Sequence, residues 1–262
     1  MMRQSLLPKT YAGEGTLTLS EQDSRYLTKV LRYAPGTCFN GIDQSGKVYD
    51  LVLIDKQTLG ISPAENGKAK QESDTLPSVK GLPRLHLLQC LCKGKKDDSI
   101  IRQATEIGVL SITFVQSRFC VSDASNKTIK AMKARNERYE AIIKEAIQQS
   151  GSAIPTSLTP EVLGIEEVPE FCKNGLGIFF HQEPLENQQS LGELLAGQTP
   201  NADIYLFVGS EGGFSAEECA LLKQGGMFPV LLKTNILRAE TAAVYALAAC
   251  QSLLQEKPHL PL

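Results

Sequence analysis

The sequence lacks several features that would place it outside the soluble globular proteins. None of its 262 residues is tryptophan, and it has no run of eighteen or so apolar residues that would predict a membrane span. The first residues, Met1 to Ser5, lack the apolar core of a secretion signal, so we expect a cytoplasmic protein. The seven cysteines have no framework spacing and no clustered metal ligands, which indicates reduced thiols and no metal site.

Familiar nucleotide-binding loops are also missing. The sequence contains no Gly-x-x-x-x-Gly-Lys-Ser/Thr loop and no Gly-x-Gly-x-x-Gly after the first strand of the predicted sheet, which disfavours triphosphate and dinucleotide ligands. The Asp/Glu-x-Gly-x-Gly loop typical of Rossmann-like methyltransferases is absent as well. A small-molecule site in this chain must therefore be built differently.

The charge is nearly balanced, with a formal net charge of −2 and an apolar content of 42%. This balance argues against wholesale wrapping of nucleic acid but permits a local basic face. Basic residues gather in three places, which favours an anionic partner over three unrelated solvated surfaces. The clusters are Arg25, Lys29 and Arg32; Lys93, Lys95 and Lys96; and the basic residues of a predicted helix over 127–149.

The pattern of elements changes near residue 80. Residues 1–73 read as short strands and turns, with a strand over 47–54, and they predict a small β-rich domain. Ser20 can cap a short helix in this part, with an apolar face of Tyr26, Leu27, Val30 and Leu31. A polar linker is predicted over about 64–83. The remainder, 74–262, alternates strands (85–91, 111–115, 177–180, 204–208, 228–232) with helices (98–108, 127–149, from 215, 238–254). Such alternation predicts a mostly parallel sheet covered by helices, whose ligands bind at the carboxyl ends of strands.

Two strand-to-helix segments are candidates for that site. The first, 208–215, is rich in glycine and ends in the Ser-x-x-Glu spacing of a capping box at Ser215 and Glu218. The second, 231–242, carries Arg238 and Glu240. Taken alone, the glycines fit a tight turn without a ligand as well as they fit a ligand loop.

The two segments resemble the knot loops of the SPOUT class of S-adenosylmethionine-dependent RNA methyltransferases, and within that class the RsmE family. The resemblance rests on Gly209-Ser210-Glu211-Gly212-Gly213-Phe214-Ser215 and on the stretch from Leu232 to Ala242. Upstream matches follow in the family's order: Val30-Leu31-Arg32, Lys93-Gly94-Lys95-Lys96, Ala104 to Val109 and Gln149-Ser150-Gly151. The chain departs from the family pattern at Gln103, Ser152, Ser210, Lys233 and Asn235, and Lys233 replaces a glycine where a long side chain can crowd the cofactor loop.

The resemblance implies an α/β fold: a SPOUT-type domain with a C-terminal trefoil knot, preceded by a small PUA-like β-barrel domain that binds RNA. The implied activity is methylation of N3 of a uridine in 16S ribosomal RNA with S-adenosyl-L-methionine as cofactor. The implied partners are 16S ribosomal RNA or the small ribosomal subunit and a second copy of the chain, bound through the knot region.

The resemblance also assigns roles to residues. Arg238 is the candidate that stabilises negative charge on the uracil oxygens, and Glu240 is a candidate general base, although an ion pair with a nearby lysine or arginine explains Glu240 equally well. The resemblance implies that the cofactor lies bent in three loops, around 180–183, 208–213 and 231–237. The expected cofactor contacts are Phe180, His181, Val208, Gly209, Glu211, Gly212, Leu232, Ile236, Leu237 and Thr241. The expected RNA contacts are Arg25, Lys29, Arg32, Lys93, Lys95 and Lys96.

Two other interpretations remain. A non-catalytic RNA-binding protein could retain the knotted fold, and Lys233 and Asn235 favour it. A nucleotide-binding enzyme with an unknotted sheet is disfavoured by the missing phosphate loops. The sequence does not identify the target uridine or the group that takes its proton.

Overall fold

The computed structural model describes residues 4–8, 11, 15–64, 82–121, 129–186 and 188–256. The predicted linker lies almost entirely outside these residues, as does the start of the predicted helix at 127. The chain divides into two compact units, Met1–Ser78 with Ile147–Pro155, and Val79–Ala146 with Thr156–Leu262. Among the described residues, no helix is long and apolar enough to cross a membrane.

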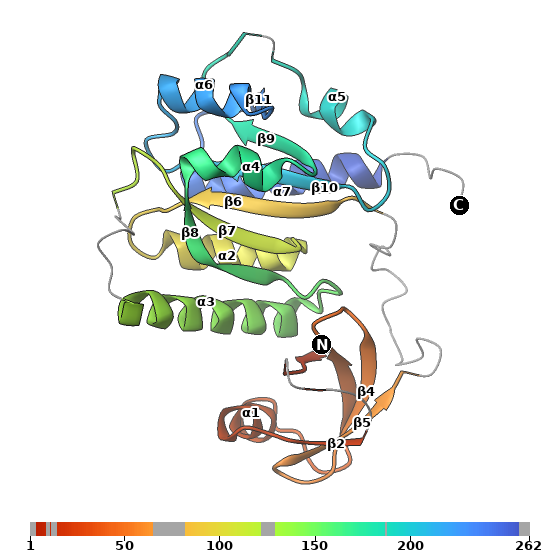
Figure 1. The fold of residues 1–262 in the computed structure, drawn as a ribbon. Coiled ribbons are helices and arrows are strands. Elements are labelled where there is room, and N and C mark those ends of the chain that lie inside the picture. Colours follow the sequence, from red (N-terminus) through yellow and green to blue (C-terminus); the bar gives the residue numbers. More distant parts are fainter. Residues whose placement is uncertain are drawn as a thin grey trace. The chain divides into compact units, whose positions relative to one another are not determined.

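The first unit is built on a five-stranded sheet in the order β1-β3-β4-β5-β2 (Figure 1). The strands are β1 (Gln4–Leu6), β2 (Gly15–Thr18), β3 (Cys38–Ile42), β4 (Val48–Leu53) and β5 (Thr58–Pro63). Only β1 and β3 pair in parallel; the other neighbours are antiparallel. In β4, alternate residues Tyr49, Leu51 and Leu53 are buried, as the sequence alternation predicts for a half-buried strand.

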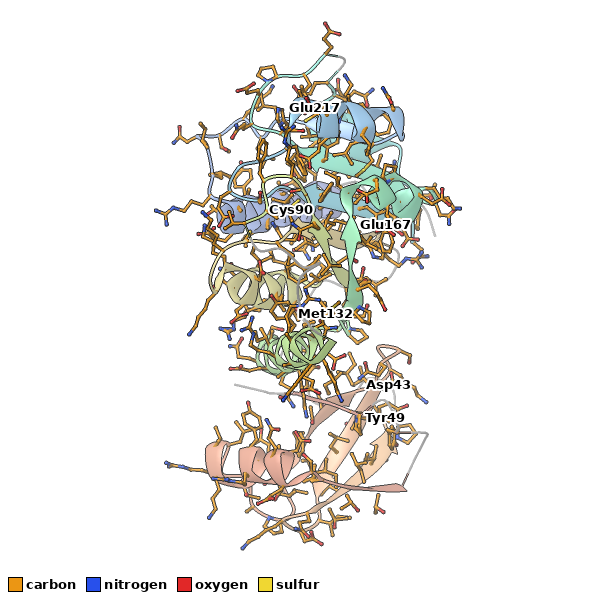
Figure 2. The ribbon with its side chains drawn as sticks, turned by 60° about the vertical axis from the view of Figure 1, so that its left-hand side comes forward. Asp43, Tyr49, Cys90, Met132, Glu167 and Glu217 are labelled. Atoms are coloured by element: carbon orange, nitrogen blue, oxygen red, sulfur yellow. The ribbon has the colours of Figure 1, made fainter. Side chains whose placement is uncertain are left out.

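The turn between β3 and β4 is held by one carboxylate. Asp43 Oδ1 accepts hydrogen bonds from the backbone amides of Ser45 (2.8 Å) and Lys47 (3.0 Å). The hydroxyl of Tyr49 donates to Asp43 Oδ2 at 3.0 Å, which ties the turn to the strand that follows (Figure 2). This turn is the one that Ser45 and Gly46 predict, since short polar residues and glycine suit such a turn.

Ser20 caps helix α1 (Glu21–Arg25) by accepting from the amide of Asp23 at 3.1 Å, as predicted. The helix then widens into a π-helical turn, Tyr26–Val30. The prediction of one apolar face through Val30 was wrong, because the wider turn shifts the residues that follow around the helix axis. Leu27 is buried, whereas Val30 is 62% exposed.

The second unit contains a six-stranded sheet in the order β11-β9-β10-β6-β7-β8, in which every pair is parallel (Figure 1). The strands are β6 (Arg84–Cys90), β7 (Ser111–Gln116), β8 (Ser157–Gly164), β9 (Leu176–Phe180), β10 (Asp203–Val208) and β11 (Phe228–Val230). The mixed α/β class with a parallel sheet is therefore confirmed. A parallel sheet is buried on both faces, which explains the nearly continuous apolar runs of β6 and β10.

Helices cover this sheet. Helix α7 (Ala239–Gln255) packs on β6 and β10 beside α2 (Lys96–Ile107) and α5 (Leu191–Ala196), and it lies behind the sheet in Figure 1. Helices α4 (Val168–Cys172) and α6 (Ala216–Gln224) share the core cluster that contains Phe179, Phe207 and Phe214. The long helix α3 spans Ile129–Ser150, and a 3-10 turn, Ile165–Glu167, precedes α4.

The sequence did not predict β8, α4 or α5. Strand β8 contains Pro160, which cannot donate to a sheet and is tolerated here because β8 is the edge strand of the order. Helix α2 begins at Lys96, two residues before the predicted cap, Asp98. Its predicted end is confirmed, since Gly108 adopts the left-handed conformation (φ 93°) that terminates a helix.

Candidate functional site

The glycine-rich segment after β10 is a tight turn. The amide of Gly213 donates to the carbonyl of Ser210 at 2.9 Å, and Gly213 has φ +68°, a conformation that L side chains rarely adopt. A Cβ at Gly209 would lie 3.1 Å from the Gly213 backbone. The turn therefore favours glycine at 213 through its backbone conformation, and a side chain at 209 would crowd the Gly213 backbone.

Phe214, which directly follows the glycine turn, is anchored in the hydrophobic core. The ring of Phe214 packs 4.8 Å from Phe207 and 5.9 Å from Phe179 between ring centroids. The predicted capping box follows: Ser215 Oγ accepts from the amide of Glu218 at 3.2 Å, and Glu218 Oε2 accepts from the amide of Ser215 at 2.8 Å. The turn is thus fixed between a buried strand and a capped helix.

A cavity of about 370 Å³ opens where β9, β10 and β11 end, the place where parallel sheets bind ligands. Three chain segments form most of its wall, 180–182, 208–213 and 231–239. The lining residues are Lys96, Phe180, His181, Gln182, Val208, Gly209, Ser210, Glu211, Gly213, Leu231, Leu232, Thr234, Asn235, Ile236, Leu237, Arg238, Ala239 and Ala242.

Eight of the ten expected cofactor contacts line this cavity. Gly212 does not, because it faces the opposite way: a Cβ there would come within 2.7 Å of Phe119 Cβ. Thr241 does not either; it is exposed on α7, one position before Ala242, which does line the cavity. Successive helical residues point about 100° apart, so only one of these two can face the site.

Lys233 does not fill the cavity. It is exposed and is absent from the lining, although its neighbours Leu232 and Thr234 both belong to it. The expectation that this lysine could crowd the loop is therefore not met in this structure. Ile236 lines the cavity while remaining 85% exposed, which places it at the rim.

A lysine joins two acidic residues at this site. Lys96 Nζ lies 2.8 Å from Glu211 Oε1 and 3.5 Å from Glu240 Oε2. The hydrogen bond to Glu211 raises the pKa of Lys96. Partial burial pushes the pKa of Glu211 upward, but hydrogen bonds from Lys96 and the backbone amide of Lys93 outweigh it, and the net pKa is lowered. Both groups are charged at neutral pH, and the pair fixes the turn to the start of α2.

Glu240 belongs to this ion-pair group rather than to the cavity wall. Its carboxylate faces Lys96, as the alternative ion-pair interpretation expects, and it is absent from the lining. Arg238 does line the cavity, at the N-cap of α7. His181 follows β9, and burial lowers its pKa, so its imidazole is neutral at pH 7.

The expected RNA contacts fall in both units. Arg25 and Lys29 lie at the end of α1 and in the π-helical turn, and Arg32 follows with φ +58°. Lys93 and Lys95 are exposed before α2. Lys96 differs from the others, because its ammonium group is engaged in the ion pairs beside the cavity.

Sequence reasoning missed Gln89. This fully buried side chain on β6 donates from Nε2 to the carbonyl of Gly209 at 3.1 Å. The hydrogen bond ties the start of the glycine turn to the neighbouring strand. A polar residue inside the apolar run 85–91 was the available signal, since a buried amide needs hydrogen-bond partners. Gln182, Ser210 and Asn235 also line the cavity; they lie within the loops expected to hold the cofactor, although none of them was an expected contact residue.

These features define a class of protein: an α/β protein with a small-molecule site at the carboxyl end of a parallel sheet, formed by a glycine turn and a second loop rather than by a phosphate-binding loop. Among the described residues there is no group of three or more His, Cys, Asp or Glu side chains suited to a metal ion. A sequence model of the RNA methyltransferase domain matches residues 80–251. The chain belongs to this RNA methyltransferase family.

Individual relatives agree with this assignment. The ribosomal RNA small subunit methyltransferase E of Synechocystis is 31% identical over 252 residues, covering 92% of this chain and 75% of the relative. The protein of the same name from Buchnera aphidicola of Acyrthosiphon pisum is 27% identical, covering 90% of this chain and 87% of the relative. The crystal structure of a ribosomal RNA small subunit methyltransferase E from Neisseria gonorrhoeae, bound to S-adenosyl methionine, superimposes with a TM-score of 0.73 at 24% identity and covers 97% of this chain and 98% of the other.

Proposed function

We propose that this protein transfers a methyl group from S-adenosyl-L-methionine to N3 of a uridine in 16S ribosomal RNA. One observation carries the proposal: the three segments that the family resemblance assigns to the cofactor meet around a single cavity. The curated relatives, named as small-subunit ribosomal RNA methyltransferases, support the choice of RNA.

The residues present suit the cofactor. Val208, Leu232, Ile236 and Leu237 offer apolar walls for an adenine ring, and the backbone of the turn at Gly209, which lines the cavity, offers hydrogen-bonding groups for its edge. The cavity volume of about 370 Å³ is within the range of small-molecule sites. When bound, the cofactor supplies an activated methyl group on a sulfonium, and the residues described next act on the RNA.

We assign Arg238 an electrostatic role in the reaction. As N3 attacks the methyl carbon, the electron pair of the sulfur–carbon bond goes to sulfur and the N3 proton must leave. Negative charge then spreads over the two uracil oxygens, and a guanidinium beside them stabilises the transition state. Arg238 is the arginine in the cavity wall, so we assign this role to it.

Glu240 is the proposed base, but it needs a rearrangement to act. Its carboxylate faces Lys96, and Lys96 rather than Glu240 lines the cavity. A proton can reach Glu240 only through a bridging water or after one of these side chains turns. Replacement of Glu240 by Gln tests the role, because a base contributes to the rate while an ion pair contributes mainly to stability.

The finer assignments follow the same resemblance. We propose that residues 1–73 form a PUA-like barrel that holds RNA through Arg25, Lys29 and Arg32, and that residues 74–262 form the SPOUT domain, with the linker at about 64–83. We further propose a trefoil knot at the C-terminal end, a homodimer through the knot region and a cytoplasmic location. Lys93 and Lys95 would neutralise RNA phosphates near the catalytic site.

The non-catalytic alternative keeps only one of the two residues that favoured it. Lys233, which could have crowded the cofactor loop, lies outside the lining of an open cavity, whereas Asn235 does line that cavity. Calorimetry with S-adenosylmethionine separates the two: binding supports the enzyme, whereas no heat up to about millimolar cofactor, which corresponds to about −4 kcal/mol of binding free energy, supports the RNA-binding protein.

The decisive experiment is primer extension on ribosomal RNA from a strain that lacks this protein. Methylation of N3 blocks base pairing and stops the polymerase, so the stop should disappear in the deletion strain and return with the wild-type gene. Complementation with Arg238→Ala is the matched control and should leave the stop absent. If the stop persists unchanged in the deletion strain, the proposed function is wrong.

A further inference from the structure

A large aromatic side chain lies exposed beside the cofactor turn. Phe119, in the loop after β7, is 41% exposed, although aromatic rings contribute most to stability when they are buried. Its ring packs against Gly212, where a Cβ would lie 2.7 Å from Phe119 Cβ and 3.0 Å from its Cγ. Glu211, the residue before this glycine, lines the cavity. The ring therefore lies on the outer side of the turn that borders the cavity.

The loop that carries this ring is held by hydrogen bonds. The amide of Cys120 donates to the carbonyl of Ser117 at 3.1 Å, which closes a turn around Phe119. The amide of Arg118 donates to Glu218 Oε1 at 2.8 Å, and Glu218 also caps α6. The ring is thus presented by a fixed backbone, so little conformational entropy remains to be lost when a partner binds.

One arginine lies beside the ring. The guanidinium carbon of Arg118 lies 5.9 Å from the centroid of Phe119. Arg118 pairs with Glu217 at 3.2 Å, but both side chains are more than half exposed, so this pair is weak and can exchange for a phosphate. Figure 2 shows Glu217 on α6. On the other side of the turn, the amide of Lys93 donates to Glu211, and the Lys93 and Lys95 residues are exposed.

An exposed aromatic ring with a cation beside it is a combination that binds single-stranded nucleic acid, because a base stacks on the ring while the cation attracts the backbone. We propose that Phe119 is a stacking platform for a base of the unpaired RNA segment that presents the target uridine. This inference rests on the proposed function and adds a residue that positions the substrate. Arg118 supports the platform by contacting the same strand.

Three variants separate stacking from mere packing. Phe119→Leu keeps an apolar contact with Gly212 but removes the aromatic face, whereas Phe119→Tyr and Phe119→Trp keep that face. The measurements are the rate of methyl transfer into small subunits from a strain lacking this protein, and calorimetry with S-adenosylmethionine. We expect Phe119→Leu to lower kcat/KM for the RNA roughly 5- to 100-fold, with the aromatic variants close to wild type and cofactor affinity unchanged in all three.

Binding of RNA fragments gives a second readout that does not need turnover. The wild-type protein should bind a short oligouridylate more tightly than an abasic oligonucleotide of the same length, and Phe119→Leu should remove that difference. An unchanged kcat/KM in Phe119→Leu overturns the inference. A loss of cofactor affinity in Phe119→Leu also overturns it, because the ring would then only support the turn at Gly212. If the wild-type protein fails to methylate RNA, the proposed function fails, and the base-dependent difference in binding still decides the role of Phe119.

Discussion

The two ends of the parallel sheet in the second unit differ in how their polar groups are satisfied. At the amino end, the guanidinium of Arg84 donates twice to Asp203, at 2.7 and 2.6 Å, and His86 Nε2 lies 2.9 Å from the same carboxylate. His86 Nδ1 lies 2.7 Å from Ser111 Oγ, and the ring of Tyr205 stacks 4.6 Å from the imidazole. This network links β10, β6 and β7, so the Asp203 carboxylate and both ring nitrogens of His86 are used within the protein.

The protonation states at the amino end follow from the same contacts. The hydrogen bonds from Arg84 hold the pKa of Asp203 below its usual value. Burial lowers the pKa of His86 and outweighs the opposite effect of Asp203, so its imidazole is neutral at pH 7. A neutral ring donates from Nε2 to Asp203 and accepts at Nδ1 from Ser111. With these partners, His86 is a buried residue whose two ring nitrogens are both hydrogen-bonded within the protein.

The carboxyl end is open by comparison. Its glycine turn and the loop 231–238 border a cavity, and Ile236 and Arg238 are exposed at its wall. Residues at this end should therefore affect binding and catalysis, whereas those at the amino end should affect stability. Four predictions test that division.

The largest effect is expected for Arg238→Ala. Loss of a group that stabilises developing negative charge costs about 10²–10³ in rate, while cofactor affinity should stay within roughly threefold, because the apolar walls remain. Single-turnover methyl transfer and calorimetry measure the two quantities. Turnover equal to wild type would remove Arg238 from the mechanism.

The next effect is expected for Gly212→Val. A side chain at this position must displace Phe119 and distort the turn, so we expect cofactor affinity to fall by about tenfold or more, equivalent to at least ~1.4 kcal/mol. Gly197→Ala is the matched control, because a Cβ there meets nothing within 4 Å. Equal cofactor affinity in the two variants would show that the turn does not shape the cofactor site.

A smaller effect, on stability, is expected for Asp203→Ala. It leaves the partly buried His86 Nε2 without its acceptor, which should lower the free energy of unfolding by ~1–3 kcal/mol. Arg84→Gln should cost less, since the Arg84 side chain is 47% exposed and its ion pair is screened by water. Urea unfolding measures both, and a loss of cofactor affinity at unchanged stability would contradict the division between the two ends.

The smallest effect concerns pH. Because the pKa of His86 is lower in the folded protein, the unfolded chain takes up a proton first as pH falls below about 6.5, and stability decreases there. Asp97 acts in the opposite direction: burial raises its pKa to about 6, so the folded protein takes up this proton first between about pH 6 and 4 and gains stability.

Comparison of wild type with His86→Gln separates these two contributions. The variant should lose less stability than wild type between pH 7.5 and 5.5, by up to ~1 kcal/mol in unfolding free energy. Identical pH profiles would mean that His86 titrates in the folded protein as it does in the unfolded chain.

Much of the second unit could be predicted because its signals are local. Apolar runs predicted five of the six strands of the parallel sheet. Ser215 and Glu218 predicted the capping box of α6, and Gly108 predicted the end of α2. Strand β8 was not predicted, because its proline and polar residues fit a strand only at the edge of a sheet. The sequence does not state which strand lies at the edge. Val30 was misplaced because a π-helical turn changes the periodicity on which the prediction relied.

The sequence by itself determined the family, five of the six strands of the parallel sheet and the two loops that border the cavity, since each depends on residues close together in the chain. Only the tertiary structure decided which way individual side chains face. In the folded protein, Gly212 faces Phe119, Lys96 pairs with Glu211 and Glu240, and Lys233 lies outside the cavity lining. The physical reason is that these contacts join residues that lie about a hundred residues or more apart in the sequence. Packing between such distant segments leaves no periodic pattern in either segment.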